Sequence, residues 1–192
     1  MSQMLINYNL MSIFKKYKIL SYTIFTLIIV SSCQEAKYSL DNPSDPENME
    51  LDPPALFFHP PEIDSKLDTV VSVEVYGLEL LPASAAHLKI KYDWGMLQYD
   101  STQANEFFKG NNNPVIVDVP EQGLLNIYLY YLPDLFSDQN DGGTWSLATI
   151  YFTTYAEGES DLEFDTEITT LRDFSNNPVP INEFGMGKIN ID

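Results

Sequence analysis

The 192-residue sequence contains one cysteine, Cys33, and two histidines, His59 and His87. A single cysteine excludes a disulfide within the chain. The two histidines have no carboxylate partners at a spacing typical of zinc ligands, so no metal site is expected. Basic residues are also scarce, because only seven follow position 33, against 28 acidic ones, for a net charge of −21. Such a surface repels phosphate backbones and disfavours nucleic-acid binding.

Catalytic motifs are also lacking. The sequence has no Gly-x-Ser-x-Gly element and no cysteine–histidine arrangement for nucleophilic catalysis. Glu163, Asp165 and Glu167 alternate along a predicted strand, which is typical of a solvated outer face rather than of a pair of catalytic carboxylates. We therefore expect a protein that is not an enzyme and that needs no cofactor.

The N-terminal 32 residues have the layout of a secretory signal peptide. Three lysines, at 15, 16 and 18, precede an apolar run from Ile19 to Val30, which is followed by small residues. That run is too short to cross a bilayer as a helix, which takes about 20 residues. Residues 1–10 fit no part of this layout, so Met11 is a candidate for the true start.

Cys33 ends the stretch Val30-Ser31-Ser32-Cys33, which resembles the bacterial lipobox. This resemblance implies cleavage before the cysteine and acylation of its thiol and its new amino group. Several acyl chains give stable membrane anchoring, whereas one chain does not. We therefore expect a lipoprotein that is anchored outside the cytoplasm, at the outer membrane or the cell surface.

Residues 33–54 form a predicted linker that begins at the lipidated cysteine. They are rich in Pro, Asp, Asn, Glu and Ser and show no hydrophobic periodicity, which is typical of a disordered spacer. Residues 55–192 then form the folded domain.

Period-2 alternation of apolar residues dominates the chain after the linker. Val71, Val73 and Val75 alternate with polar or aromatic residues in "TVVSVEVYG", and "AHLKIKYD", "LLNIYLYYL" and "SLATIYFTTY" follow the same pattern. Only "STQANEFF" is compatible with a helical turn. Short strands at this spacing with no helices between them predict an all-β, antiparallel β-sandwich of about nine strands.

The order of these segments resembles the cohesin family and the related carbohydrate-binding modules, which are jelly-roll sandwiches. The resemblance covers residues 65–192 and is carried by "VSVEVYGLE", "LKIKYDWGMLQY", "QGLLNIYLYYL", "GTWSLATIYFTTYAEGESDLEF", "LRDFSNNPVPI" and "GMGKINI". It implies a non-catalytic module that binds a protein partner, a dockerin-like module, through a sheet face.

Two predicted strands carry the residues of that face. Their outward positions are also where two of the seven basic residues meet tyrosines, which are favoured in interfaces. The predicted partner-binding residues are His87, Lys89, Lys91, Asn126, Tyr128 and Tyr130.

Two alternatives remain open at the level of sequence. Exposed aromatic residues can stack on sugar rings, so a polysaccharide could bind at Trp94, Tyr99 and Trp145, together with Tyr128 and Tyr130. The chain could also be a structural subunit of a cell-surface glycan-utilisation complex.

Overall fold

Strands make up almost all of the regular structure in the computed structural model, which describes residues 50–108, 112–132 and 141–192. The predicted signal peptide, Cys33 and most of the predicted linker lie outside these residues. Among the described residues, no helix has the length and apolar character needed to span a bilayer. The strands are β1 (Ala55–His59), β2 (Glu62–Ser65), β3 (Val70–Leu80), β4 (Ala85–Lys91), β5 (Leu97–Ala104), β6 (Val115–Glu121), β7 (Leu124–Tyr130), β8 (Gly143–Thr154), β9 (Gly158–Phe164), β10 (Thr170–Arg172), β11 (Pro178–Val179), β12 (Glu183–Phe184) and β13 (Gly187–Ile191).

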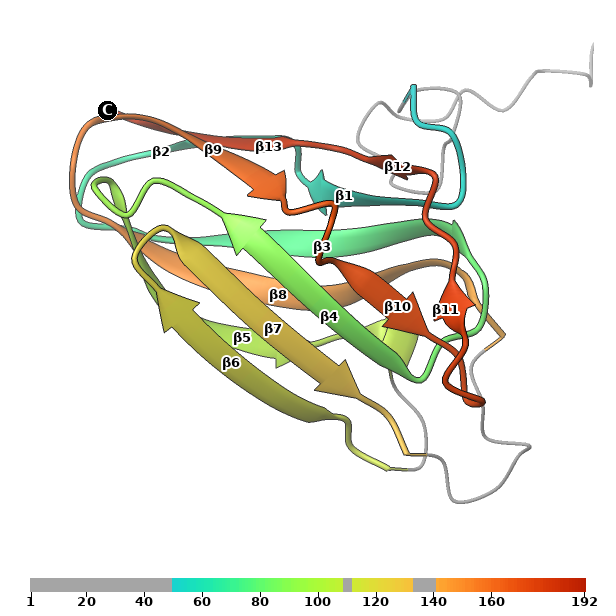
Figure 1. The fold of residues 1–192 in the computed structure, drawn as a ribbon. Helices are drawn as coiled ribbons and strands as arrows, with labels where there is room; N and C mark the ends of the chain where they lie inside the picture. The colour runs from blue at the N-terminus through green and yellow to red at the C-terminus, as the bar shows by residue number, and fades with distance from the viewer. Residues whose placement is uncertain (1–49, 109–111, 133–140) are drawn as a thin grey trace, which may run out of the picture. The chain divides into compact units, whose positions relative to one another are not determined.

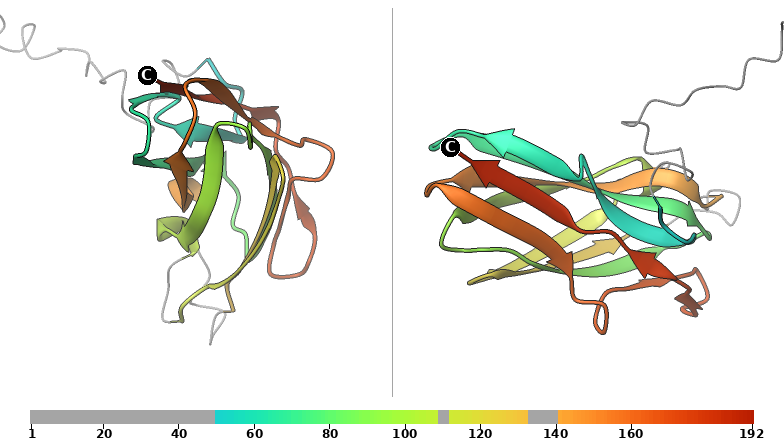
Figure 2. Two further views of the ribbon diagram at one scale, coloured as in Figure 1. Left: turned by 90° about the vertical axis from the view of Figure 1, so that its left-hand side faces the viewer. Right: turned by 90° about the horizontal axis from the view of Figure 1, so that it is seen from above.

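Two sheets pack face to face, with β4, β7 and β6 in front of β3, β8 and β5 in Figure 1, and Figure 2 shows the two layers from other sides. The five-stranded sheet has the order β12-β1-β3-β8-β5. The second sheet runs β11-β10-β4-β9-β13-β2, and β7 pairs with the other side of β4 and carries β6 as the edge strand. The predicted all-β sandwich is therefore confirmed.

The alternation read from the sequence places the core side chains. Val71, Val73 and Val75 are buried between the sheets, and their neighbours Ser72 and Glu74 are not. The same inward pattern holds on the other central strands, with Leu88, Ile90, Leu125, Ile127, Leu129, Ala148, Ile150 and Phe152 all in the core. Burial of one such aliphatic or aromatic side chain contributes about 1.5–3 kcal/mol, so this shared interior is the main source of stability.

The strand number and the strand directions differ from the prediction. The described residues form 13 strands rather than about nine, and the sheets are mixed, because β1 pairs in parallel with β12 and β2 pairs in parallel with β13. The segment that contains β1 and β2 passes from one sheet to the other, and so does the segment that contains β12 and β13. Each segment is therefore divided into two strands. Pro60 and Pro61 divide the first segment because proline cannot donate to a strand ladder. Hydrophobic alternation carries no information about such a crossing or about strand direction.

Two local predictions need similar correction. "SDLEFDTEITTL" was predicted as one strand, but the turn at residues 165–169 divides it into β9 and β10. Asp165 and Glu167 therefore lie in a turn, and only Glu163 lies on a strand.

The predicted helical turn is confirmed only at its end, where Glu106–Phe108 form the 3-10 helix η1, because β5 occupies the residues through Ala104.

The described residues before β1 contact the sandwich. Leu51 packs on a small cluster of Ala55, Phe57 and Leu78, outside the main core. The Asn182 side chain donates a hydrogen bond to the Pro53 carbonyl at 2.7 Å, and its backbone N–H donates to the Pro54 carbonyl at 2.7 Å. These contacts hold the chain beside β12 where it enters the domain.

Candidate functional site

The six predicted partner-binding residues lie on two neighbouring strands, β4 and β7, which pair in antiparallel orientation. His87 is opposite Tyr128, and Lys89 is opposite Asn126. Directly opposed residues share one face of a sheet, and residues two apart along a strand share it as well. Lys91 and Tyr130 therefore complete one continuous surface. We call the outward surface of β6, β7, β4 and β10 the β4–β7 face.

His87 lies at the centre of this face and is held by two contacts. Its imidazole stacks on the Tyr128 ring, with centroids 4.2 Å apart and an interplanar angle of 16°. Its Nε2 atom is hydrogen bonded to Asn126 Oδ1 at 3.1 Å. Two aromatic rings with fixed orientations form a flat surface that loses little side-chain entropy when a partner binds.

Lys89 is fixed from its other side by the turn between β9 and β10. Its Nζ atom is 3.1 Å from Asp165 Oδ2, and this hydrogen bond is the main reason that the pKa of Asp165 lies below its ordinary value. The backbone N–H of Lys89 donates to Thr169 Oγ1 at 3.1 Å. Lys91 is exposed and lies opposite Glu163. The lysine end of the face is thus balanced in charge rather than strongly positive.

The sequence prediction missed the valines of β6. Val115, Val117 and Val119 are 51%, 47% and 43% exposed, and they lie opposite Tyr130, Tyr128 and Asn126 on β7. The sequence feature that could have placed these valines on the face is the two-residue turn Gln122–Gly123, because it fixes the register of β6 against β7.

The sequence prediction also missed two residues on β10. Thr170 is opposite His87 and Arg172 is opposite Ala85, so both side chains belong to the β4–β7 face. Arg172 Nη1 donates to the Asn176 carbonyl at 2.9 Å. Asp173, next along the chain, accepts hydrogen bonds from the Ser175 and Asn177 N–H groups at 2.8 Å, and its bonds from Asn177 keep its pKa below the ordinary value.

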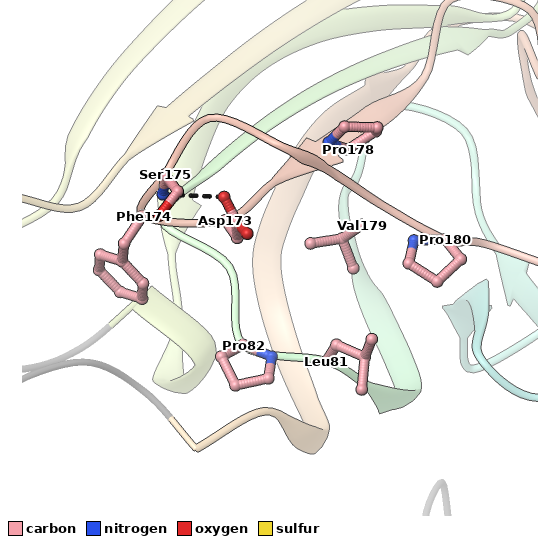
Figure 3. Close-up of a pocket in the computed structure, with 8 residues that line it drawn as sticks. All are labelled: Leu81, Pro82, Asp173, Phe174, Ser175, Pro178, Val179 and Pro180. Atoms are coloured by element: carbon pink, nitrogen blue, oxygen red, sulfur yellow. Dashed lines mark hydrogen bonds between the residues drawn. The ribbon is translucent and has the colours of Figure 1, made fainter.

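A groove of about 480 Å³ lies beyond this end of the face, between the β3–β4 connection and the β10–β11 hairpin (Figure 3). Its walls are mostly apolar, and the Asp173 carboxylate turns back toward Ser175 rather than into the groove. The lining residues are Leu81, Pro82, Asp173, Phe174, Ser175, Pro178, Val179 and Pro180.

The three residues predicted as an alternative sugar-stacking set do not form one row. Trp145 lies near the beginning of β8, while the Trp94 carbonyl accepts a hydrogen bond from the Tyr155 hydroxyl just after the end of β8. Tyr99 packs edge-on against the core residue Phe152, and its hydroxyl lies 3.0 Å from Thr102 Oγ1. Burial is the main cause that raises the pKa of Tyr99. A flat polymer surface would require the three rings side by side.

The β4–β7 face therefore combines exposed aliphatic, aromatic and amide groups on neighbouring strands of one sheet. Its central positions on β6, β7 and β4 include no carboxylate, and Glu121, at the end of β6 opposite Leu124, is the one carboxylate that these three strands place on the face. Interface centres share this composition, with aromatic residues enriched and acidic ones depleted. The arrangement is suited to non-covalent association with another protein.

No model of a known protein family matches this sequence, and no curated protein matches it. Solved structures do match. The sixth cohesin of scaffoldin B from Acetivibrio cellulolyticus, in complex with a Cel5 dockerin mutant, is 19% identical with a TM-score of 0.58, over 72% of this chain and 98% of that one. A type II cohesin from the same organism is 16% identical with a TM-score of 0.60, over 71% and 94%. A non-cellulosomal cohesin from Archaeoglobus fulgidus is 13% identical with a TM-score of 0.54, over 72% and 90%. The chain therefore has a cohesin-like fold, as the resemblance in its sequence implies.

Proposed function

We propose that this protein is a lipid-anchored, extracytoplasmic binding module that recognises a protein partner non-covalently through the β4–β7 face. The observation that carries the proposal is the row Val117, Tyr128 and His87, in which a half-exposed valine, a tyrosine and a stacked histidine lie side by side across three strands. A partner that covers this row removes apolar and aromatic surface from water without burying an unpaired charge.

The fold supports a protein partner over other ligands. Several of the solved cohesins that share this fold are in complex with dockerins. By analogy, the partner proposed for this chain is a dockerin-like module. The function proposed is binding rather than catalysis, in keeping with the solved cohesins of this fold that are in complex with dockerins.

The anchor is proposed from the sequence. The lipobox-like stretch ending at Cys33 supplies the attachment, and the acidic linker is long enough to hold the domain away from the bilayer. With this anchor, the location proposed for the protein is the outer membrane or the cell surface.

The decisive experiment compares two matched double variants. V117S/Y128S alters the centre of the β4–β7 face, and V70S/Y151S alters exposed or half-exposed residues of the same types on the outer face of the five-stranded sheet. The partner is first identified by a photo-crosslinking amino acid placed at Tyr130 in the full chain, and its affinity is then measured by calorimetry. V117S/Y128S should weaken binding more than tenfold, because central apolar and aromatic residues carry most interface energy.

V70S/Y151S should leave the affinity within about twofold. Both variants should unfold at denaturant concentrations close to that of the parent chain, which shows that a loss of affinity is not a loss of fold. Equal losses for the two variants, or no loss for V117S/Y128S, would remove the β4–β7 face as the binding site.

A further inference from the structure

The edge strand of the β4–β7 face, β6, carries a carboxylate on its core side. Asp118 lies opposite the buried Ile127 of β7, so its side chain points between the sheets, whereas the exposed Val117 and Val119 on either side of it point outward. Asp118 Oδ1 is buried and has no hydrogen-bond partner among the described residues. A charged group is costly in this position, because the buried oxygen loses water and gains no donor in return.

The contact that Asp118 does make is with Tyr99, which lies on β5, the edge strand of the opposite sheet. Burial raises the pKa of the Tyr99 hydroxyl, and a hydrogen bond to Asp118 and the charge of Asp118 raise it further. The same hydroxyl lies 3.0 Å from Thr102 Oγ1, and either oxygen can be the donor. Tyr99 therefore keeps a partner without Asp118. An apolar residue of similar size at position 118 should support the sandwich at least as well as the carboxylate does.

The other edges of the two sheets are poor templates for pairing with another strand. β11 and β12 have two residues each, and β2 has four and follows Pro60 and Pro61. β5 has eight residues, but a register shift between Tyr99 and Ser101 interrupts it. In contrast, β6 pairs with β7 in continuous register over all seven of its residues, and Figure 1 shows it at the free side of its sheet. Among the described strands, β6 is thus the long and regular edge, the kind that pairs readily with another chain.

The residues of β6 both favour and oppose such pairing. Val115, Val117 and Val119 are exposed, and valine is among the residues that stabilise strands most. Asp118 is an inward-pointing charge, and Pro120 removes one N–H from the strand. Inward-pointing charges and prolines are two features by which edge strands avoid pairing with other chains.

We infer that Asp118 and Pro120 keep the β6 edge from pairing with the β6 edge of a second copy of this chain. A second β6 strand would enclose the Asp118 carboxylate beside its own, and it would meet no N–H at Pro120. Without this protection, two copies related by a two-fold axis would join their β4–β7 faces into one sheet, with the valines side by side. With it, each copy presents its face separately. The inference does not depend on which partner that face binds.

The test removes both features in the full chain. D118V/P120T replaces the carboxylate by an apolar residue that favours strands and restores the missing N–H. Its mass is measured by sedimentation velocity in detergent, over a range of protein concentrations, beside the parent chain. The parent should remain monomeric, whereas the mass of D118V/P120T should rise toward about twice that of the monomer as the concentration increases.

Two further variants separate edge pairing from a general increase in stickiness. D161V makes the same charge-to-valine change on β9, which has paired strands on both of its sides, and it should remain monomeric. V117K, added to D118V/P120T, places a charge on the exposed side of β6 and leaves the core side unaltered. It should return the variant to the monomer, because two copies of the lysine would repel each other across the paired edges.

The stability of D118V alone tests the assigned role of the carboxylate. D118V should unfold at a denaturant concentration equal to or above that of the parent chain. A clearly lower value would show that Asp118 stabilises the sandwich, and would overturn the inference. So would a monomeric D118V/P120T, an association of D161V as strong as that of D118V/P120T, or a failure of V117K to reverse it. None of these outcomes affects the β4–β7 proposal, which is tested by affinity for the partner.

Discussion

At the scale of single residues, Thr169 fixes the position of Lys89 on the β4–β7 face. Its side chain is buried, and its hydroxyl both accepts a hydrogen bond from the Lys89 N–H, at 3.1 Å, and donates one to the Lys89 carbonyl, at 3.3 Å. The Lys89 carbonyl has a second partner in the Asp165 N–H, at 2.8 Å. The Lys89 N–H is the group that depends on Thr169.

Replacement of Thr169 by valine keeps the shape of the side chain and removes this hydroxyl. We expect T169V to lower the free energy of unfolding by about 1–3 kcal/mol, because it leaves a part-buried backbone donor without an acceptor. Urea denaturation followed by fluorescence measures the change. T169S retains the hydroxyl and is expected to be closer to the parent protein, so equal stability of T169V and T169S would contradict the assigned role.

At the scale of elements, glycines allow β12 and β13 to cross close to β1. A Cβ atom on Gly185 would lie 2.8 Å from Phe57 Cβ, and one on Gly187 would lie 2.9 Å from Phe58 Cβ. Phe57 belongs to the small outer cluster and Phe58 to the main core. The C-terminal segment therefore passes from one sheet to the other directly over β1, where any larger residue would separate the strands.

Gly187→Ala tests this crossing. We expect a loss of about 1–3 kcal/mol in the free energy of unfolding, because the added methyl group meets a backbone-proximal atom of a buried strand that has no room to move. Gly95→Ala is the control, since a Cβ atom at that exposed position meets only the Asp93 side chain. A chemical denaturation curve for G187A that coincides with that of G95A would show that β13 is not tightly packed against β1.

The sequence predicts the central strands well and their surroundings less well, and the elements show why. The central strands β3, β4, β7 and β8 each have one buried and one open face. Apolar residues therefore recur along them with period 2, and this pattern predicts which side chains are buried. β6 alternates too, but three of its exposed positions are valines, and valine alone does not distinguish a core face from a binding face. The parallel pairing of β13 with β2 joins residues more than 120 positions apart, and no local pattern encodes it.

At the scale of the whole molecule, the proposed location depends on one group, the Cys33 thiol. The chain after residue 33 carries a net charge of −21, which opposes adsorption to an anionic membrane surface. In the proposed lipoprotein, the acyl chains on Cys33 therefore provide the membrane affinity, and the sandwich provides the binding.

This separation of roles predicts the behaviour of C33S expressed in a bacterium. The parent protein should appear in the membrane fraction and incorporate a metabolically supplied palmitate analogue, whereas C33S should be unlabelled. The proposal makes the acyl chains the attachment of the mature domain. Any C33S that is cleaved at another site should therefore be recovered in the soluble extracytoplasmic fraction, and uncleaved C33S should stay at the inner membrane as a larger species. The released form should bind the β4–β7 partner with the affinity of the parent domain, because the anchor and the face share no residue.

An unlabelled parent protein, or a C33S protein that matches the parent in size and remains in the outer-membrane fraction, would show that something other than Cys33 acylation holds the chain there.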